Sequence, residues 1–269
     1  METKPVQADR DSENVQLDKA VISKLPPGCK VLSVSPSGES QWVDTAMIVV
    51  QFQDGGKVNF FKKSAGGAAA SAMMKGTFEA EQALYTFVPG QVPKPIACGA
   101  YINDPSTNFY LCDFVEMNDD VPTTRGWAST VSALHLKSMG KSPTGQFGFY
   151  VTTHLANVPV NNTWQSTWEA FWKQQMESLF DREKQLHEPD EENESLKLAY
   201  LDSVIPRYLR PLESNGKSIT PCLIHSDLWP GNIKPKSSSN ELCIFDACAY
   251  WGHNEGLFPS RSGSSKYRH

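Results

Sequence analysis

The sequence predicts an α+β protein built as two lobes. Strand-like runs and one long helix fill residues 15–115, whereas residues 116–255 are mostly helical. A β-rich part followed by an α-rich part is typical of two lobes with separate layers. Of the 269 residues, 39% are hydrophobic and 20% are charged, a composition that supports a large buried core. Residues 1–14 and 256–269 are polar and are expected to be disordered.

Periodicity and turn residues define the elements of the first lobe. Leu17, Val21 and Leu25 lie at helical spacing, and residues 26–28 (PPG) end that short helix. A connector rich in Gly, Ala and Ser, residues 64–72, leads into a predicted helix at 73–87. Apolar runs bounded by turn residues predict five strands, at 31–35, 42–52, 57–62, 96–102 and 109–114.

The second lobe is predicted to contain three long helices and two short buried strands. The helices lie near 124–139, 165–186 and 195–212. The apolar runs 222–224 and 242–245 each lead into a segment that carries an aspartate. The acidic run 188–194 is interpreted as a solvated loop and helix start rather than a metal site.

Charge and hydropathy exclude several classes of function. The net charge is −5 and the basic residues are scattered, which argues against a nucleic-acid partner. No run approaches the roughly 18 apolar residues of a membrane span, and the N-terminus lacks the apolar region of a secretory signal. The six cysteines are spread over the chain, so we expect a cytoplasmic protein with reduced thiols.

The strongest chemical pattern lies where the two short strands end. His225 and Asp227 follow the first strand, Asn232 comes five residues after Asp227, and Asp246 ends the second strand. Phosphoryl transfer needs one carboxylate to orient the attacking hydroxyl, and an amide oxygen with a second carboxylate to hold Mg²⁺. Asp227 fits the first role, and Asn232 and Asp246 fit the second. The spacing matches the kinase pattern H-R-D-x-x-x-x-N followed by a metal-binding aspartate. An ordinary turn rich in Asp, Pro, Gly and Asn is the alternative.

The first lobe offers the partners that a kinase requires. A kinase holds the nucleotide phosphates with a lysine on the third strand and a glutamate on the next helix. Lys62 and Lys63 end the third predicted strand, and their side chains must point to opposite faces. We predict that Lys62 enters the cleft, that Lys63 faces solvent, and that Glu81 is the glutamate, with Glu79 as a weaker candidate. A surface lysine and a surface glutamate are the alternative for either residue alone.

Two further segments fit a nucleotide site only weakly. Residues 33–40 (SVSPSGES) contain one glycine, although serine hydroxyls and backbone N–H groups can cap phosphates. Residues 110–116 follow the fifth strand, where a kinase has the hinge that binds adenine, and a plain strand-to-helix connection is the alternative. A zinc site built from Cys222, His225, Cys243 and Cys248 is disfavoured by its poor ligand spacing.

Three segments resemble the fructosamine/ketosamine-3-kinase family. Residues 225–232 (HSDLWPGN) are similar to that family's H-G-D-L-W-x-G-N. Residues 245–255 (FDACAYWGHNE) are similar to Y-D-P-A-x-x-Y-G-H-x-E. Residues 146–149 (QFGF), with the following Asn162, Trp164 and Trp168, resemble K-F-G-F…N-x-W…W. The order and spacing agree from about residue 30 to Glu255, and the D-L-W-x-G-N and Y-x-G-H-x-E pair separates this family from aminoglycoside and choline kinases.

The resemblance implies a bilobal protein-kinase-like fold and an activity. Members of the family use ATP and Mg²⁺ to phosphorylate the 3-hydroxyl of ketosamines, either small or attached to glycated proteins, and the phosphate then destabilises the adduct. By position, Asp227 would accept the proton. Asp113, Phe114 and Val115 would form the nucleotide-binding hinge, whereas Trp229 and His253 would shape the sugar pocket or serve as core residues.

The chain also departs from the family pattern. Ser226 replaces a glycine, which costs strain if φ is positive there, and Ala247 replaces a proline. After Glu255 the family continues into helices that complete the second lobe, so the resemblance implies an incomplete lobe and apolar surface left exposed. Two alternatives therefore stay open: an inactive, truncated pseudokinase-like form, and a related aminoglycoside- or choline-type phosphotransferase.

Overall fold

The computed structural model describes residues 17–38, 40, 42–188, 190–239 and 241–256. The segments expected to be disordered, residues 1–14 and 256–269, lie outside the described residues apart from Gly256. Within the described residues, every helix is too short or too polar to cross a bilayer.

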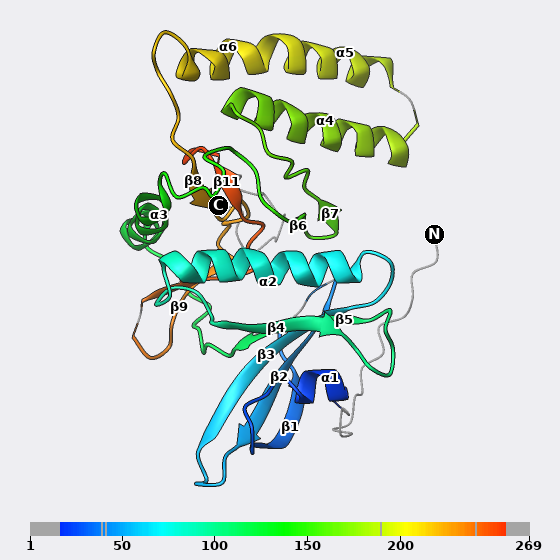
Figure 1. Ribbon diagram of the computed structural model, residues 1–269, viewed down its shortest axis with the longest axis vertical. Coiled ribbons are helices and arrows are strands. Elements are labelled where there is room, and N and C mark those ends of the chain that lie inside the picture. The colour runs from blue at the N-terminus through cyan, green and yellow to red at the C-terminus, as the bar shows by residue number, and fades with distance from the viewer. Residues whose placement is uncertain (1–16, 39, 41, 189, 240, 257–269) are drawn as a thin grey trace.

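The first lobe is a five-stranded antiparallel sheet with a long helix on one face (Figure 1). The strand order is β1-β2-β3-β5-β4. The helix α2 (Ala70–Phe87) lies between this sheet and the second lobe. The strands are β1 (Lys30–Pro36), β2 (Asp44–Gln51), β3 (Lys57–Ala65), β4 (Pro95–Ala100) and β5 (Asn108–Asp113).

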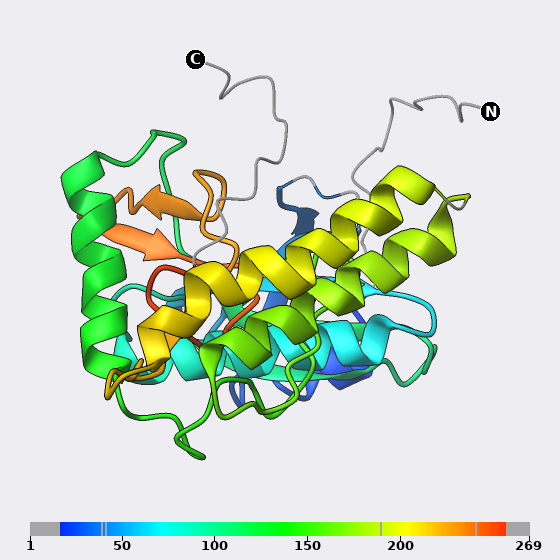
Figure 2. The same cartoon turned by 90° about the horizontal axis from the view of Figure 1, so that it is seen from above.

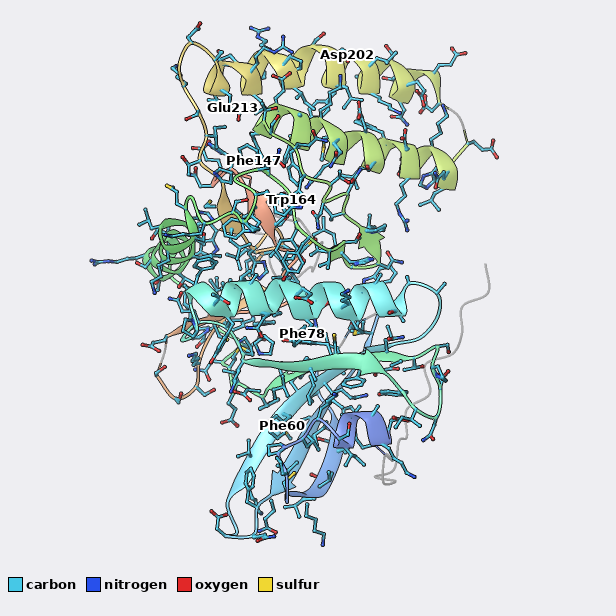
Figure 3. The ribbon with its side chains drawn as sticks, in the orientation of Figure 1. Phe60, Phe78, Phe147, Trp164, Asp202 and Glu213 are labelled. Carbon is cyan, nitrogen blue, oxygen red and sulfur yellow. The ribbon has the colours of Figure 1, made fainter. Side chains whose placement is uncertain are left out.

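The two faces of the sheet have different hydrophobic cores. The short helix α1 (Lys19–Ile22) covers the outer face, where Val21 packs with Ile48 and Phe60. The inner face packs against α2 through Met73, Met74 and Tyr110. Figure 3 shows Phe60 on the α1 side of the sheet and Phe78 close to α2. Since side chains alternate along a strand, the outer core fixes which residues of β3 face inward.

The second lobe joins a helical arm to a set of short strands. The helices are α3 (Thr124–Ser138), α4 (Trp168–Leu186), α5 (Glu191–Ala199) and α6 (Ile205–Leu209). A short π-helix, Tyr200–Val204, links α5 to α6, and a short 3-10 helix, Arg210–Glu213, follows α6. Figure 2 shows α4 lying side by side with the α5–α6 arm.

Short strands carry the segments with the chemical pattern. They are β6 (His154–Leu155), β7 (Val158–Pro159), β8 (Cys222–Ile224), β9 (Ile233–Pro235), β10 (Leu242–Ile244) and β11 (Tyr250–Gly252). β8 pairs with β11, and β9 pairs with β10, both antiparallel. The Ser138 hydroxyl at the end of α3 accepts the Leu223 N–H at 2.9 Å and so fixes β8 on α3.

The segment around Phe147 connects α4 to β11. Gly148 exchanges backbone hydrogen bonds with Trp251 at 3.0 and 2.8 Å, and Phe147 does so with Gln165 at 2.9 and 2.8 Å. Gly148 has a φ of +144°, and a Cβ there would lie 2.8 Å from the backbone carbonyl oxygen of Asn162. The Q-F-G-F segment singled out in the sequence is therefore a structural bridge, and only glycine fits its third position.

We expect Gly76→Ala to destabilise the protein by about 2 kcal/mol, the usual scale for overpacking a core. Gly76 lies in α2, and a Cβ on it would lie 2.4 Å from the Thr152 carbonyl oxygen. In an exposed helix the same change would stabilise, because alanine is the better helix former. Urea unfolding measures the effect, with Ser71→Ala on the exposed side of α2 as the control. An unfolding midpoint that rises for both variants would contradict the close packing.

Candidate active site

A cleft of about 1170 Å³ lies between the two lobes and gathers residues from both. The sheet and α2 contribute Phe61, Lys63, Glu81 and Tyr110. The connection between the lobes and the short strands of the second lobe line the other side, with Asp113, Phe114, Val115, Met117, Trp229, Gly231, Asn232, Phe245 and Asp246. Candidate residues far apart in the sequence are therefore brought together in one cleft.

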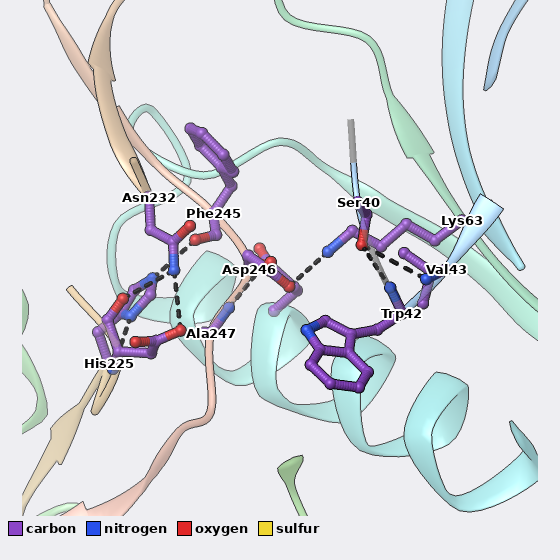
Figure 4. Close-up of polar contacts among 11 residues, drawn as sticks. Ser40, Trp42, Val43, Lys63, His225, Asn232, Phe245, Asp246 and Ala247 are labelled. Carbon is purple, nitrogen blue, oxygen red and sulfur yellow. Dashed lines mark hydrogen bonds and ion pairs between the residues drawn. The ribbon is translucent and has the colours of Figure 1, made fainter. Parts of the chain in front are cut away.

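Lys63, and not Lys62, is the lysine in the cleft. Its Nζ donates to Asp246 Oδ1 in an ion pair that joins the two lobes (Figure 4). Burial lowers the pKa of Lys63, but the charge and hydrogen bond of Asp246 raise it by more, so the pKa is raised overall. The expectation that Lys63 faces solvent is wrong.

The prediction for Lys62 is corrected by the outer core of the sheet. Phe60 points toward α1, and the side chain two residues later points to the same face. Lys62 is accordingly buried there, with its Nζ donating to Ser64 Oγ at 2.9 Å and to the Tyr101 hydroxyl at 2.7 Å. It does not line the cleft.

Glu81, the glutamate predicted on the helix, is buried and lines the cleft. Its Oε1 accepts the Ala247 N–H at 3.2 Å, and its Oε2 has no hydrogen-bond partner among the described residues. Burial raises the pKa of Glu81 to about 7, although the Ala247 N–H and the Lys63 charge oppose the rise. The competing candidate, Glu79, instead accepts the Tyr150 hydroxyl at 2.8 Å.

We expect Glu81→Gln to stabilise the nucleotide-free protein at pH 8 and to change it little at pH 4.5. The folded-state pKa is about 7, above the ordinary value of 4.5, so the folded state holds the proton more tightly between these values. The wild-type protein therefore loses stability as pH rises through this window, whereas the glutamine variant does not. The expected gain at pH 8 is about 1–3 kcal/mol, measured by urea unfolding at both pH values. A gain of equal size at both would show that ionisation is not its cause.

Buried hydrogen bonds fix the loop that carries Asp227. The Asp227 N–H donates to His225 Nδ1 at 3.3 Å, and the opposite ring nitrogen, Nε2, donates to the Phe245 carbonyl at 3.0 Å. The imidazole is therefore neutral, and burial lowers its pKa to about 4. His225 ties the Asp227 loop to the Asp246 segment and takes no part in lining the cleft.

Asn232 links Asp227 to the cleft. Its Nδ2 donates to the Asp227 carbonyl at 2.8 Å and to Asp227 Oδ2 at 3.1 Å. Both donor positions of the amide are thus used within the loop, and Oδ1 accepts no hydrogen bond from the described residues. Asn232 and Asp246 both line the cleft, whereas Asp227 does not line it and is joined to the cleft wall by its hydrogen bonds with Asn232.

Two residues of this region have left-handed backbone conformations. φ is +63° at Ser226 and +61° at Asp246. The expectation of strain at Ser226, where the family has glycine, is therefore confirmed. At Asp246, burial would raise the pKa, but the Lys63 charge and hydrogen bond outweigh it, so the pKa is lowered and the carboxylate is ionised.

Among the described residues of the connection between the lobes, Val115 has a backbone N–H that makes no hydrogen bond. The Asp113 N–H donates to the Lys94 carbonyl at 3.0 Å, and the Phe114 N–H donates to the Asn59 carbonyl at 3.1 Å. The Val115 N–H donates to no other described residue, and Val115 lines the cleft. Burial also raises the pKa of the Asp113 carboxyl, against the charge of Lys94.

Of the two residues predicted to shape a sugar pocket, Trp229 lines the cleft and His253 does not. Trp229 lines the cleft, and its indole covers Gly231, where a Cβ would lie 2.2 Å from the ring. His253 does not line the cleft, because its ring lies 6.1 Å from that of Trp168 and its Nδ1 accepts the Glu255 N–H. Trp42, which sequence reasoning missed, lines the same cleft as the Lys63–Asp246 pair although 51% of it is exposed (Figure 4). The sequence analysis placed Trp42 at the start of the predicted strand 42–52 and gave no signal that it lines a site.

The donor set fits magnesium better than zinc. Asn232 and Asp246 offer hard oxygens at one wall of the cleft, and Mg²⁺ is usually held by one or two such protein ligands together with phosphates and water. Within the described ranges, no group of three or more His, Cys, Asp or Glu residues could hold a metal ion. Burial raises the pKa of Cys222, Cys243 and Cys248 to about 12, which disfavours the thiolates that zinc requires.

Comparison with solved structures defines the class of fold. A putative fructosamine-3-kinase from Thermobifida fusca aligns with a TM-score of 0.65 and 22% identity, covering 88% of this chain and 74% of that protein. An aminoglycoside phosphotransferase, solved with ADP and hygromycin B, aligns with a TM-score of 0.55 and 14% identity, covering 89% and 73%. The fold is thus the bilobal protein-kinase-like fold.

The sequence comparisons identify the family. The fructosamine kinase family model matches residues 38–258, and the chain belongs to that family. The chloroplastic protein-ribulosamine 3-kinase of Arabidopsis thaliana is 30% identical over 209 residues, which are 74% of this chain and 57% of that protein. The ketosamine-3-kinase of Mus musculus is 36% identical over 127 residues, 44% of this chain and 38% of that protein. The chain spans little more than half the length of the plant relatives it matches.

Proposed function

We propose that this protein is an ATP-dependent ketosamine 3-kinase. It transfers the γ-phosphoryl group of ATP to the 3-hydroxyl of a ketosamine, the sugar adduct that glycation leaves on a lysine amine. The observation that carries the proposal is the meeting of Lys63 and Asp246 in one cleft, which Glu81 and Asn232 also line, with Asp227 hydrogen-bonded to Asn232. The names of the plant and mouse relatives support a ketosamine as the acceptor.

The first-lobe side of the cleft would bind the nucleotide. The available N–H of Val115 supports hydrogen bonding to adenine, with Asp113 and Phe114 completing the hinge. Lys63 would carry the positive charge for the phosphates. Glu81, with its unpartnered Oε2, is placed to accept Lys63 when Asp246 turns to other ligands.

Asn232 and Asp246 would hold Mg²⁺, which neutralises charge that develops on the phosphates. Asp246 is ionised and Asn232 has an uncommitted amide oxygen, so both side chains suit a hard cation. Lys63 contacts Asp246 Oδ1, so the other carboxylate oxygen, Oδ2, would be available to the metal.

Asp227 would orient the attacking hydroxyl and accept its proton. The Asp227 backbone N–H donates a hydrogen bond to His225, and the Asn232 side-chain amide donates one to the Asp227 carboxylate. These two hydrogen bonds would hold the carboxylate in position. Such a positioned base lowers the barrier mainly by holding the hydroxyl in line with the phosphoryl group. Trp229 covers the neighbouring wall and would pack against the sugar.

We also propose a cytoplasmic location. All six cysteines are free, and four of them are buried, which supports a reducing compartment. The rice and Arabidopsis relatives are named chloroplastic, so a plastid is the alternative. Cell fractionation of the native host distinguishes the two: recovery with plastids would contradict the proposed location.

A panel of acceptors tests the proposed reaction. The purified protein is incubated with Mg·ATP and a ribulosamine, a fructosamine, an aminoglycoside or choline, and the phosphorylated product is located by mass spectrometry. We expect phosphate on the 3-hydroxyl of a ketosamine. Transfer only to the aminoglycoside or to choline would replace the proposal with the related phosphotransferase. Nucleotide binding without transfer to any acceptor would favour the inactive pseudokinase-like form.

A further inference from the structure

Three buried polar groups lie behind the Asp227 loop without hydrogen bonds. They are the Ser226 hydroxyl, the Tyr250 hydroxyl and the amide nitrogen of Gln175. Their residues are 1%, 0% and 5% exposed. None of the three atoms has a partner among the residues that the structure describes. Buried polar groups in folded proteins are nearly always paired, so three together need an explanation.

The three groups come from separate elements that meet at Tyr250. Tyr250 in β11 pairs with Ile224 in β8, two residues before Ser226. The Tyr250 ring lies 5.1 Å from that of Phe171, and Gln175 follows Phe171 by one turn of α4. Burial raises the pKa of the Tyr250 hydroxyl, and Ser226 and Gln175 oppose that rise from close by. Ser226 and Gln175 are therefore the groups that face the Tyr250 hydroxyl.

The donors and acceptors of the three groups match in a single chain. The Gln175 amide can donate to the Tyr250 oxygen, and the Ser226 hydroxyl can donate to the same oxygen. This arrangement satisfies all three unpartnered atoms at once. It also ends on Ser226, whose left-handed φ of +63° needs support that a glycine would not need.

We propose that Gln175, Tyr250 and Ser226 form a hydrogen-bonded chain that positions Asp227 from α4. These are positioning residues: Ser226 directly precedes Asp227, so fixing its strained backbone fixes the direction of the carboxylate. The inference rests on the proposed phosphoryl transfer for its catalytic consequence. The hydrogen-bonded chain is argued from the burial of its three groups and from the strands and helix that meet at Tyr250.

Tyr250→Phe removes the central hydroxyl and keeps the ring. We expect kcat to fall about tenfold with the KM for ATP nearly unchanged, because misdirected groups slow chemistry more than binding. Gln175→Met should do the same, and the double variant should be no worse than either single variant. Tyr208→Phe, at an exposed tyrosine of α6, is the matched control.

Two substitutions at Ser226 separate the hydroxyl from the backbone strain. Ser226→Ala removes the hydroxyl and keeps the strain, so both kcat and the melting temperature should fall. Ser226→Gly also removes the hydroxyl but relieves the strain, so kcat should fall while the melting temperature does not. Unchanged kcat in Tyr250→Phe and Ser226→Ala would overturn the positioning role.

A readout independent of activity keeps this proposal apart from the proposed function. If the wild-type protein phosphorylates no acceptor, the proposed function fails. The melting temperatures of the single and double variants then still test whether the hydrogen-bonded chain exists. A double-variant shift smaller than the sum of the single shifts supports hydrogen bonding between Gln175 and Tyr250. Additive shifts would overturn it.

Discussion

Lys63→Met should abolish most phosphoryl transfer, whereas Lys62→Met should leave it nearly intact. Lys63 faces the cleft and contacts Asp246, so its loss removes the cation that would hold the phosphates. Removing a preorganised charge of this kind lowers kcat by about 10²–10³-fold. Lys62 faces the outer core, where its loss removes two hydrogen bonds and costs about 1–2 kcal/mol of stability.

The two lysines thus act as controls for one another. Steady-state kinetics measures transfer, and urea unfolding measures stability, for both variants. The expected results are opposite: one variant is slow and stable, the other active and less stable. Equal loss of activity in both variants, or a larger loss for Lys62→Met, would contradict the assignment of the two faces of β3.

Asp227→Asn should lower kcat by about 10²–10⁴-fold and leave nucleotide binding unchanged, because only the proton acceptor is lost. The asparagine keeps the shape of the side chain, and its oxygen can still accept the hydrogen bond from Asn232. Kinetics gives kcat, and calorimetry gives the affinity for Mg·ATP.

Asp202→Asn is the control for this substitution. Asp202 lies on the helical arm of the second lobe, where it pairs with Lys173 at the surface. It should keep wild-type kcat and affinity. If Asp227→Asn also kept wild-type kcat, another group would have to accept the proton.

Strand alternation predicts part of the first lobe and leaves one choice open. It places Lys62 and Lys63 on opposite faces, and the structure agrees. The choice between the faces depends on α1, because Phe60 joins the outer core that this helix covers. Local pattern cannot supply that choice, since both faces of β3 carry a phenylalanine, Phe60 or Phe61.

Spacing predicts the catalytic loop well because its contacts are local. Asn232 reaches Asp227 across one short turn, and His225 accepts the N–H of Asp227, two residues later in the chain. The strain at Ser226 was also predictable, because a glycine is replaced at a position that needs positive φ. The role of His225 as a bridge to Phe245 could not be predicted, because it depends on a contact across 20 residues.

Long-range packing settles positions that local pattern leaves open or misses. His253 follows β11 and packs against Trp168 outside the cleft, so the packing role, one of the two predicted for it, fits the structure. Trp42 lies in the connection between β1 and β2, and only the meeting of the two lobes makes it part of the cleft. Gln175 and Tyr250 come together through α4 and β11, which are distant in the sequence.

Thermal unfolding with ATP, in the presence and absence of Mg²⁺, tests the central claim most directly. A ligand that binds only the folded state must raise the melting temperature, by an amount that grows with its concentration. We expect a rise with Mg·ATP, a smaller one with ATP alone, and loss of the Mg²⁺ dependence in Asp246→Asn. No rise with Mg·ATP, or an equal rise in Asp246→Asn, would show that the cleft between Lys63 and Asp246 does not hold the metal–nucleotide complex.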